Sequence, residues 1–386
     1  MTGTNTKPET PVHITGILGG YIFGMLSLWL APVFVGEFMH AYDISEQEIG
    51  LIFGLQAGAI ALVSLYCSYR VSVLRLRKLA CAGAVLALTA HGLSLMADTF
   101  QVFTLCRILA GTGEGMAFAA ANTAGAAVKN PDRVFAQAQL ASMSVVVVLL
   151  FAVPDITAQY GFRMSLGAMI LALVVSAPLM TRFPVAGIGV DIKISGKFNH
   201  YPLPVLGISI LIAFTLVNLS DIGIWVFSER IAADIGMTPD AISWSLGAVT
   251  ILGMSGPLLA ALLGDRFGLV IPLTAGLVLE GCSALLVVYA TGPISYSAGL
   301  VLLLISIGFL IPYFLGVLAR LDKHGAWTTL SGTIVSFAMA IGPVFSGFIA
   351  AHAGYTTVGW FTVGFCCAAL SILLAVLQSL GRTKEY

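Results

Sequence analysis

Charged residues are scarce in this sequence. Only 9% of its 386 residues are Asp, Glu, Lys or Arg, whereas 58% are hydrophobic, and the mean hydropathy is +0.99. A composition of this kind excludes an ordinary water-soluble globular protein. Basic and acidic residues balance at 18 each, so the chain lacks the net positive charge that attracts nucleic acid. We therefore expect no nucleic-acid partner.

Motifs of enzymes and metal sites are also missing. The sequence contains no HExxH motif, no phosphate-binding loop and no Cys/His cluster. Its six cysteines have neither metal-ligand spacing nor the pattern of a disulfide framework; they are Cys67, Cys81, Cys106, Cys282, Cys366 and Cys367. The sequence thus predicts free, packed thiols, no cofactor, no metal and no enzymatic activity.

Long apolar runs are abundant. Twelve of them approach or exceed the roughly 20 residues that a helix needs to cross a bilayer. The period-two alternation of a transmembrane β-barrel is absent, which predicts an all-α polytopic membrane protein. The expected spans are 14–38, 49–69, 79–97, 101–127, 134–153, 164–181, 203–227, 241–263, 269–290, 296–319, 330–352 and 356–380.

The basic residues lie almost entirely on one side of these spans. Of the 18 Lys and Arg residues, Arg107 lies within a span, and only Arg163 and Arg230 fall on the opposite side if the amino terminus is cytoplasmic. The positive-inside rule then places both termini in the cytoplasm. Residues 1–12 lack the charged start of a signal peptide, so the first span is expected to remain in the protein. We expect a plasma-membrane protein, of the bacterial inner-membrane type.

Two helix starts lie half the chain length apart. Ser45 and Glu48 form a capping box before the second span, and Thr238 with Pro239 has the N-cap and N1 residues of a helix before the eighth. This spacing predicts a duplicated architecture. Its expected parts are a cytoplasmic tail (1–12), a six-helix half (13–181), a cytoplasmic linker (182–202), a second six-helix half (203–381) and a short cytoplasmic tail (382–386).

Several motifs resemble those of the major facilitator superfamily of secondary transporters. The loop GDRFG at 264–268 is similar to the family's inter-helix loop, and Arg107 followed by Gly111 and Gly113 is similar to its fourth-helix motif. PDR at 131–133 and Gly-Pro at 342–343 also fit. The resemblance implies twelve helices in two halves, alternating access, and a gating latch formed by Gly264, Asp265, Arg266 and Gly268. The first-half copy of this loop departs from the pattern at Ser72 and Arg75.

Charged residues within the spans are the main functional candidates. Arg107, Glu114 and Asn122 fall within one arc of a helix at 100° per residue. Arg107 has two possible roles: a substrate anchor, which the family resemblance favours, or a structural partner of Glu114. Burial favours the neutral form of Glu114 and Arg107 favours its carboxylate, so Glu114 is a candidate proton carrier or half of a permanent ion pair.

Polar residues of other spans complete the predicted site. Tyr21 and Gln56 are candidate pocket residues, with simple backbone bonding as the alternative for each. Asn218, Asp221 and Trp225 share one helical face in the seventh span. Asp221 is a second candidate proton carrier there, unless it lies at the outer interface with Trp225 in the aromatic belt.

Two other titratable residues within the spans are expected to be structural. His91 lies in the third span and Glu280 in the ninth. These spans resemble the peripheral, supporting helices of the family, and this resemblance makes buried pairing the expected role of both residues.

Together these features predict a secondary transporter for a small organic solute, coupled to protons. An anionic solute is favoured because Arg107 is the only cation within a span. The expected partners are the solute, protons and membrane lipids, and the expected working unit is a monomer. Drug or metabolite efflux by proton antiport is the alternative, although residues 134–153 lack the glycine-rich motif of the family's drug antiporters. A sensor without transport activity is a minor alternative.

Overall fold

A computed structural model describes residues 11–69, 75–126, 128, 131–183, 203–264, 266–321 and 326–382. These residues form helices and turns, and no strand occurs among them. Nine of the helices in these ranges are long and apolar enough to cross a membrane, and a bent helix pair adds a tenth span if it is counted as one. The chain is therefore a multi-pass, all-helical membrane protein.

The helices follow one another with short connections. In order along the chain they are α1 (Pro11–Trp29), α2 (Ala31–Tyr42), α3 (Glu46–Tyr69), α4 (Leu76–Ser94), α5 (Phe100–Ala126), α6 (Pro131–Tyr160), α7 (Phe162–Ser176), the 3-10 helix η1 (Ala177–Arg182), α8 (Leu203–Val226), α9 (Ser228–Asp234), α10 (Pro239–Gly253), α11 (Ser255–Leu263), α12 (Val270–Val288), α13 (Pro293–Leu321) and α14 (Ala326–Arg382). The predicted linker lies almost entirely outside the described residues, as do most of both tails.

Packing divides the chain into two compact units. The first comprises Met1–Leu30, Ala59–Leu149 and Gln159–Ile192, and the second comprises Ala31–Gly58, Leu150–Ala158 and Lys193–Tyr386. The two six-helix halves stay a prediction.

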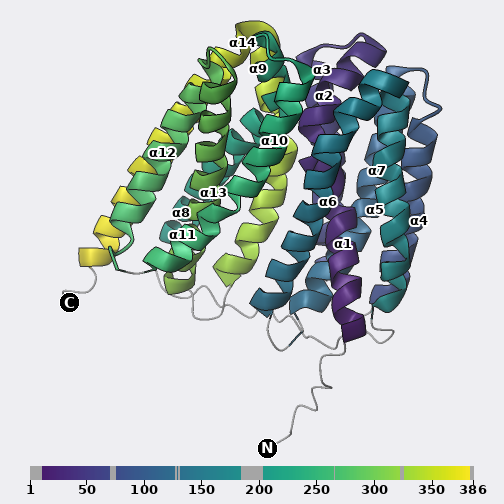
Figure 1. Ribbon diagram of the computed structural model, residues 1–386. Coiled ribbons are helices and arrows are strands. Elements are labelled where there is room, and N and C mark those ends of the chain that lie inside the picture. Colours follow the sequence, from purple (N-terminus) through teal and green to yellow (C-terminus); the bar gives the residue numbers. More distant parts are fainter. Residues whose placement is uncertain are drawn as a thin grey trace, which may run out of the picture. The chain divides into compact units, whose positions relative to one another are not determined.

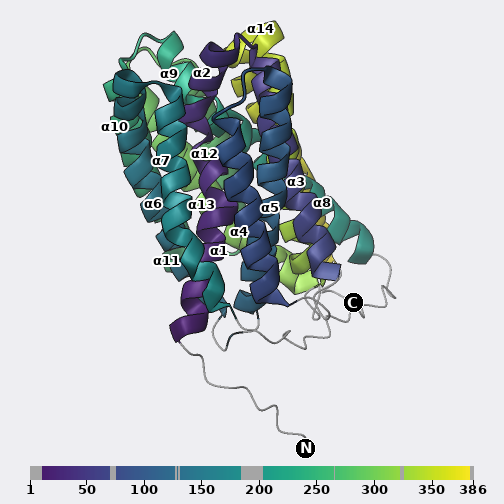
Figure 2. The ribbon, with the colours of Figure 1, turned by 90° about the vertical axis from the view of Figure 1, so that its right-hand side faces the viewer.

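In the first unit α4 packs along α5, and α1 packs on α5 (Figure 2). Small residues allow this close approach. A side chain at Gly20 would meet Ala117 and Ala121 of α5, and one at Gly24 would meet the ring of Phe118. α5 is therefore held by neighbours on more than one face.

In the second unit α8, α12, α13 and α14 lie side by side (Figure 1). Their contacts bury an apolar core in which the rings of Phe214 on α8 and Phe314 on α13 lie 5.0 Å apart. α14 runs over 57 residues but contains one non-helical residue, Gly354, with φ 78°. This residue separates the helical segments that correspond to the last two predicted spans.

Two predicted spans are broken in the structure. The expected helix 14–38 is divided into α1 and α2, which are bent by 51°. The physical reason is Pro32 in the first turn of α2, because proline lacks the amide donor that a continuous helix would use there. The expected helix 241–263 is divided at Met254 into α10 and α11, just before Pro257.

Both predicted helix starts are confirmed. The Ser45 backbone amide donates to Glu48 Oε2 over 2.9 Å, and the Glu48 amide donates to Ser45 Oγ over 3.4 Å, which is the reciprocal pattern of a capping box. The Ala241 amide donates to Thr238 Oγ1 over 3.3 Å, with Pro239 at the first helical position. These local signals fix where α3 and α10 begin.

Candidate functional site

Arg107 and Glu114 of α5 meet His91 of α4 in the interior of the first unit. Arg107 Nη1 lies 3.1 Å from His91 Nδ1, and His91 Nε2 lies 2.8 Å from Glu114 Oε1. All three side chains are completely buried. The guanidinium also lies 6.0 Å from the centre of the Phe103 ring. The three residues form what we call the Arg107–His91–Glu114 chain.

The chemistry of the three groups fixes the tautomer of His91. A guanidinium only donates hydrogen bonds, so His91 Nδ1 must accept from Arg107. The ring proton is then on Nε2, where it donates to the Glu114 carboxylate. His91 is therefore neutral in this arrangement, and a second proton on its ring would break the contact with Arg107.

Close packing of α4 on α5 brings His91 to this position. A side chain at Gly113 would meet the backbone of Gly83 and Ala87, so the two helices touch along their small residues. His91 follows Ala87 by one helical turn and points at the same neighbour. The buried position predicted for His91 is confirmed, whereas its contact with both charged residues was not predicted.

Tyr21 and Asn122 meet on another side of α5. The Tyr21 hydroxyl donates to Asn122 Oδ1 over 3.0 Å, and its ring packs edge-on against Phe118 at 5.1 Å. Both polar residues are half-buried. The structure thus joins two of the predicted pocket residues in one hydrogen bond, and their role in binding a solute stays a prediction.

The second unit contains the other predicted polar residues. Gln56 and Trp225 are buried. The Asn218 amide donates to the Phe214 carbonyl of its own helix over 2.8 Å, so this donor stabilises α8 in the described state. Their roles in solute binding stay predictions.

Asp221 of α8 has an acidic neighbour that was not predicted. Glu280 of α12 lies close enough for the two carboxyl groups to interact electrostatically, and Ser306 of α13 is hydrogen-bonded to Glu280 Oε2. Asp221 is 7% exposed and Glu280 is completely buried. The two acids come from helices that are distant in sequence, and nothing in the local pattern indicates that they meet.

The predicted gating loop follows α11. Gly264 has φ 51° and Gly268 has φ 66°, conformations that side chains rarely adopt. The Gly264 carbonyl accepts a hydrogen bond from the Tyr313 hydroxyl over 2.9 Å. Asp265 lies outside the described residues, so the predicted latch between Asp265 and Arg266 stays a prediction.

A charged cluster lies beyond the end of the α8 span, on the short helix α9. Burial raises the pKa of Glu229 to about 7, and the nearby acids Glu37 and Asp234 act in the same direction. Arg230 and a hydrogen bond from the Gly36 backbone oppose this shift. Glu229 therefore changes its charge near neutral pH.

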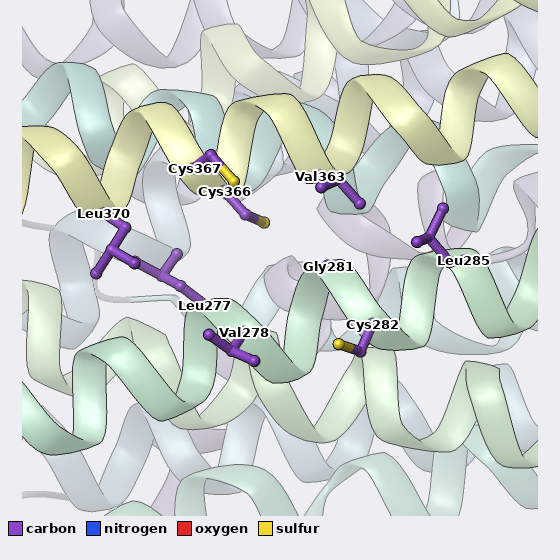
Figure 3. Close-up of a pocket in the computed structure, with 9 residues that line it drawn as sticks. All are labelled: Leu277, Val278, Gly281, Cys282, Leu285, Val363, Cys366, Cys367 and Leu370. Carbon is purple, nitrogen blue, oxygen red and sulfur yellow. The ribbon is translucent and has the colours of Figure 1, made fainter.

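An apolar groove of about 200 Å³ lies between α12 and the last part of α14 (Figure 3). Three thiols line it, Cys282 from α12 and Cys366 and Cys367 from α14. The other lining residues are Leu277, Val278, Gly281, Leu285, Val363 and Leu370. The groove has no charged or amide side chain, so it does not suit a polar solute.

Comparisons with known proteins place this geometry in context. No model of a known protein family matches the chain. A curated relative, the lincomycin resistance protein LmrB of Bacillus subtilis (strain 168), is 23% identical over 191 residues, which is 48% of this chain and 40% of LmrB. The aligned part of this chain thus spans less than half the length of that relative.

Solved structures match over almost the whole chain. The crystal structure of the nucleoside transporter NupG is similar at a TM-score of 0.72 and 12% identity, covering 96% of this chain and 99% of NupG. A D-xylose-proton symporter is similar at a TM-score of 0.74 and 14% identity, covering 95% of this chain and 96% of that chain. The chain therefore has the fold of the major facilitator superfamily transporters, as its motifs predict.

Proposed function

We propose that the chain is a proton-coupled secondary active transporter that moves a small organic solute across the membrane by alternating access. The observation that carries this proposal is the fold, which is shared over almost the full length with a nucleoside transporter and a sugar-proton symporter. Buried ionisable residues within the spans are the second support, because such residues are costly in a bilayer and commonly mark ion pathways.

The proposal includes twelve spans in two six-helix halves. The bent pair α1–α2 counts as one span, α5 is added because its 27 residues exceed the bilayer thickness despite two charges, and α14 counts as two around Gly354. Both termini are cytoplasmic by the positive-inside rule, and the membrane is a bacterial inner membrane. The working unit is a monomer.

Glu114 and Asp221 are the proposed proton carriers, one in each predicted half. Glu114 is supported by its contact with His91, since imidazole is the side chain that ordinarily titrates near neutral pH. A proton that arrives at His91 changes its bond to Arg107, which gives the Arg107–His91–Glu114 chain two distinct arrangements. Alternating access needs a switch of this kind.

Tyr21, Gln56, Asn122, Asn218 and Trp225 are the proposed solute-binding residues. Arg107 makes an organic anion the first solute class to test, because its planar fork of donors suits a carboxylate. An anchoring role requires that the chain to His91 opens in another state, since Arg107 is completely buried in the described one.

Uptake into proteoliposomes tests the function directly. Purified protein is reconstituted, an inward proton gradient is imposed, and accumulation of labelled organic anions, nucleosides and sugars is measured. We expect one class to accumulate above its equilibrium level and to stop doing so when a protonophore is added. Accumulation that is indifferent to the proton gradient, or none in any class, would contradict the proposal.

Drug efflux by proton antiport is the second candidate, favoured by the similarity to a lincomycin resistance protein. In that case the same vesicles should accumulate hydrophobic cations or a lincosamide only when the gradient is reversed. The direction of the effective gradient therefore separates the two candidates.

A further inference from the structure

Asp221 and Glu280 are two buried acids that no described cation neutralises. The described titratable groups that interact with them are each other and the thiol of Cys366 on α14. Ser306 is their neighbour on α13. Two carboxylates that interact away from water repel each other, and one thiol and one hydroxyl offer no compensating charge.

Each acid also has one buried carboxylate oxygen that accepts no hydrogen bond from the described residues. Asp221 Oδ1 and Glu280 Oε1 are buried and have no hydrogen-bond partner within the described part of the chain. A buried carboxylate oxygen without a partner carries a large desolvation penalty. A proton held on one of these groups removes the desolvation penalty of that group and the repulsion between the two.

Ser306 supplies an independent geometric argument. Its hydroxyl oxygen is within hydrogen-bond range of Glu280 Oε2 and lies 2.8 Å from the Leu303 carbonyl of its own helix. A hydroxyl has one proton to donate, and neither a carbonyl nor a carboxylate can donate in return. Both contacts are hydrogen bonds at once only if Glu280 is protonated and donates to Ser306, which then donates to Leu303.

We propose that Asp221 and Glu280 form a proton-binding dyad that holds one proton between α8 and α12, with Ser306 as the hydroxyl that reorients when the proton leaves. A divalent metal ion does not fit this place, because no group of three or more His, Cys, Asp or Glu side chains that could hold one occurs among the described residues. The dyad is separate from the Arg107–His91–Glu114 chain. Its coupling to solute movement rests on the proposed transport function, whereas proton binding itself does not.

Infrared difference spectroscopy of the purified protein tests proton binding without any solute. A protonated buried carboxyl group gives a C=O band that disappears as the pH rises. We expect such a band in the wild type, and we expect the pH at which it disappears to change in both Asp221→Asn and Glu280→Gln, because each variant leaves a single acid. In Asp221→Asn the remaining Glu280 band should titrate at a pH lower by about one unit or more, because a negative neighbour has been removed. Ser306→Ala leaves both acids in place and should move the band in frequency.

Several results would overturn the dyad. An unchanged Glu280 titration in Asp221→Asn means that the two groups do not share a proton. A titration that moves when sodium replaces choline at constant ionic strength means that the site binds a metal cation instead. If Glu280→Gln does not fold, Asp221→Asn and Ser306→Ala still decide the outcome. Arg163→Gln, at an exposed pair elsewhere, is the control and should change nothing.

Transport separates this inference from the proposed function. Asp221→Asn and Glu280→Gln should each lose gradient-driven accumulation while retaining at least part of the exchange of labelled for unlabelled solute. If the dyad titrates in a protein that shows no proton-driven transport, proton binding by Asp221 and Glu280 is supported and the proposed transport function is contradicted. If both variants still accumulate solute at wild-type levels in response to the proton gradient, the transport function is supported and a role of the dyad in it is contradicted.

Discussion

The stability of the first unit depends on the hydrogen bonds of the buried Arg107–His91–Glu114 chain. A buried charge is stable only while its partners remain, and removal of one partner from a buried pair typically costs about 3–5 kcal/mol. Because His91 contacts both of the other residues, a change at any one of the three alters the hydrogen bonds of the others.

Arg107→Gln should lower the free energy of unfolding by about 3–5 kcal/mol, because it leaves Glu114 and His91 buried without the guanidinium. The double variant with Glu114→Gln should recover part of that loss. Thermal unfolding of detergent-purified protein measures both. Arg163→Gln is the matched control: it breaks the exposed pair with Asp98 and should cost less than about 1 kcal/mol.

The more conservative Arg107→Lys separates support from substrate anchoring. Lysine keeps the charge but lacks the planar fork. A substrate anchor would give weaker solute affinity at nearly normal stability. Normal affinity with reduced stability would assign Arg107 to the buried chain alone and remove the main argument for an anionic solute.

Glu229 should make stability depend on pH. Its pKa rises to about 7 in the folded protein, against a model-peptide value of about 4.3 when unfolded. Between these two values the folded state binds the extra proton, so the protein loses stability as the pH rises through this range. The melting temperature should fall from pH 5.5 to pH 8, and Glu229→Gln should flatten that fall.

Asp98→Asn is the control for this prediction, because Asp98 is an exposed acid in the other unit. The pH profile of this variant should follow the wild type. A Glu229→Gln profile that also follows the wild type would show that Glu229 does not titrate in this range.

At the scale of helices, the sequence could predict features that depend on residues close together in the chain. The capping box at Ser45 and the N-cap at Thr238 are local, since each is formed by residues within one turn. The electrostatic interaction of Asp221 with Glu280 could not be predicted from the sequence, because it depends on how α8, α12 and α13 pack. Pro32 indicates a helix break between α1 and α2, but the apolar run continues on both sides of it, so a single continuous span was predicted.

The position of His91 against α5 is an intermediate case. The connection between α4 and α5 is short, and a short connection favours antiparallel neighbours. Which residues of α4 face Arg107 depends on the contact of Gly83 and Ala87 with Gly113, and this register is a property of the folded pair.

Gly50 allows α3 to approach α14 in the second unit. A side chain there would meet the Pro343 carbonyl, which is backbone and cannot move aside. Gly50→Ala should therefore destabilise the protein by about 1–3 kcal/mol, the usual cost of overpacking. Chemical denaturation of the two purified proteins measures the difference.

Gly58→Ala is the matched control on the same helix. Its side chain would meet only the Cβ of Ala340 at 3.7 Å, an ordinary contact. This change should be neutral or slightly stabilising, because alanine favours helix over glycine by about 1 kcal/mol. An equal loss of stability in Gly50→Ala and Gly58→Ala would mean that the contact of Gly50 with α14 is not closer than that of Gly58.

At the scale of the whole molecule, the proposed mechanism requires two access states. The loop after α11 is the predicted latch between them, and Asp265 is its acidic member. Asp265→Asn should favour one state, because the amide cannot form an ion pair. Labelling of single introduced cysteines from each side of the membrane reports the change, with Asp240→Asn as the control.

An unchanged labelling pattern together with wild-type transport in Asp265→Asn would reduce this loop to a turn. The positive φ values of Gly264 and Gly268 would then be sufficient reason for its glycines.

Gly354 has a consequence for biosynthesis. It is the only residue inside α14 with non-helical backbone angles, so the two arms of this helix are joined without a longer loop between them. The arms should therefore leave the translocon as one helical hairpin. A ribosome-stalling reporter fused after residue 353 or after residue 382 would register the force of that event, which we expect only once the second arm has emerged.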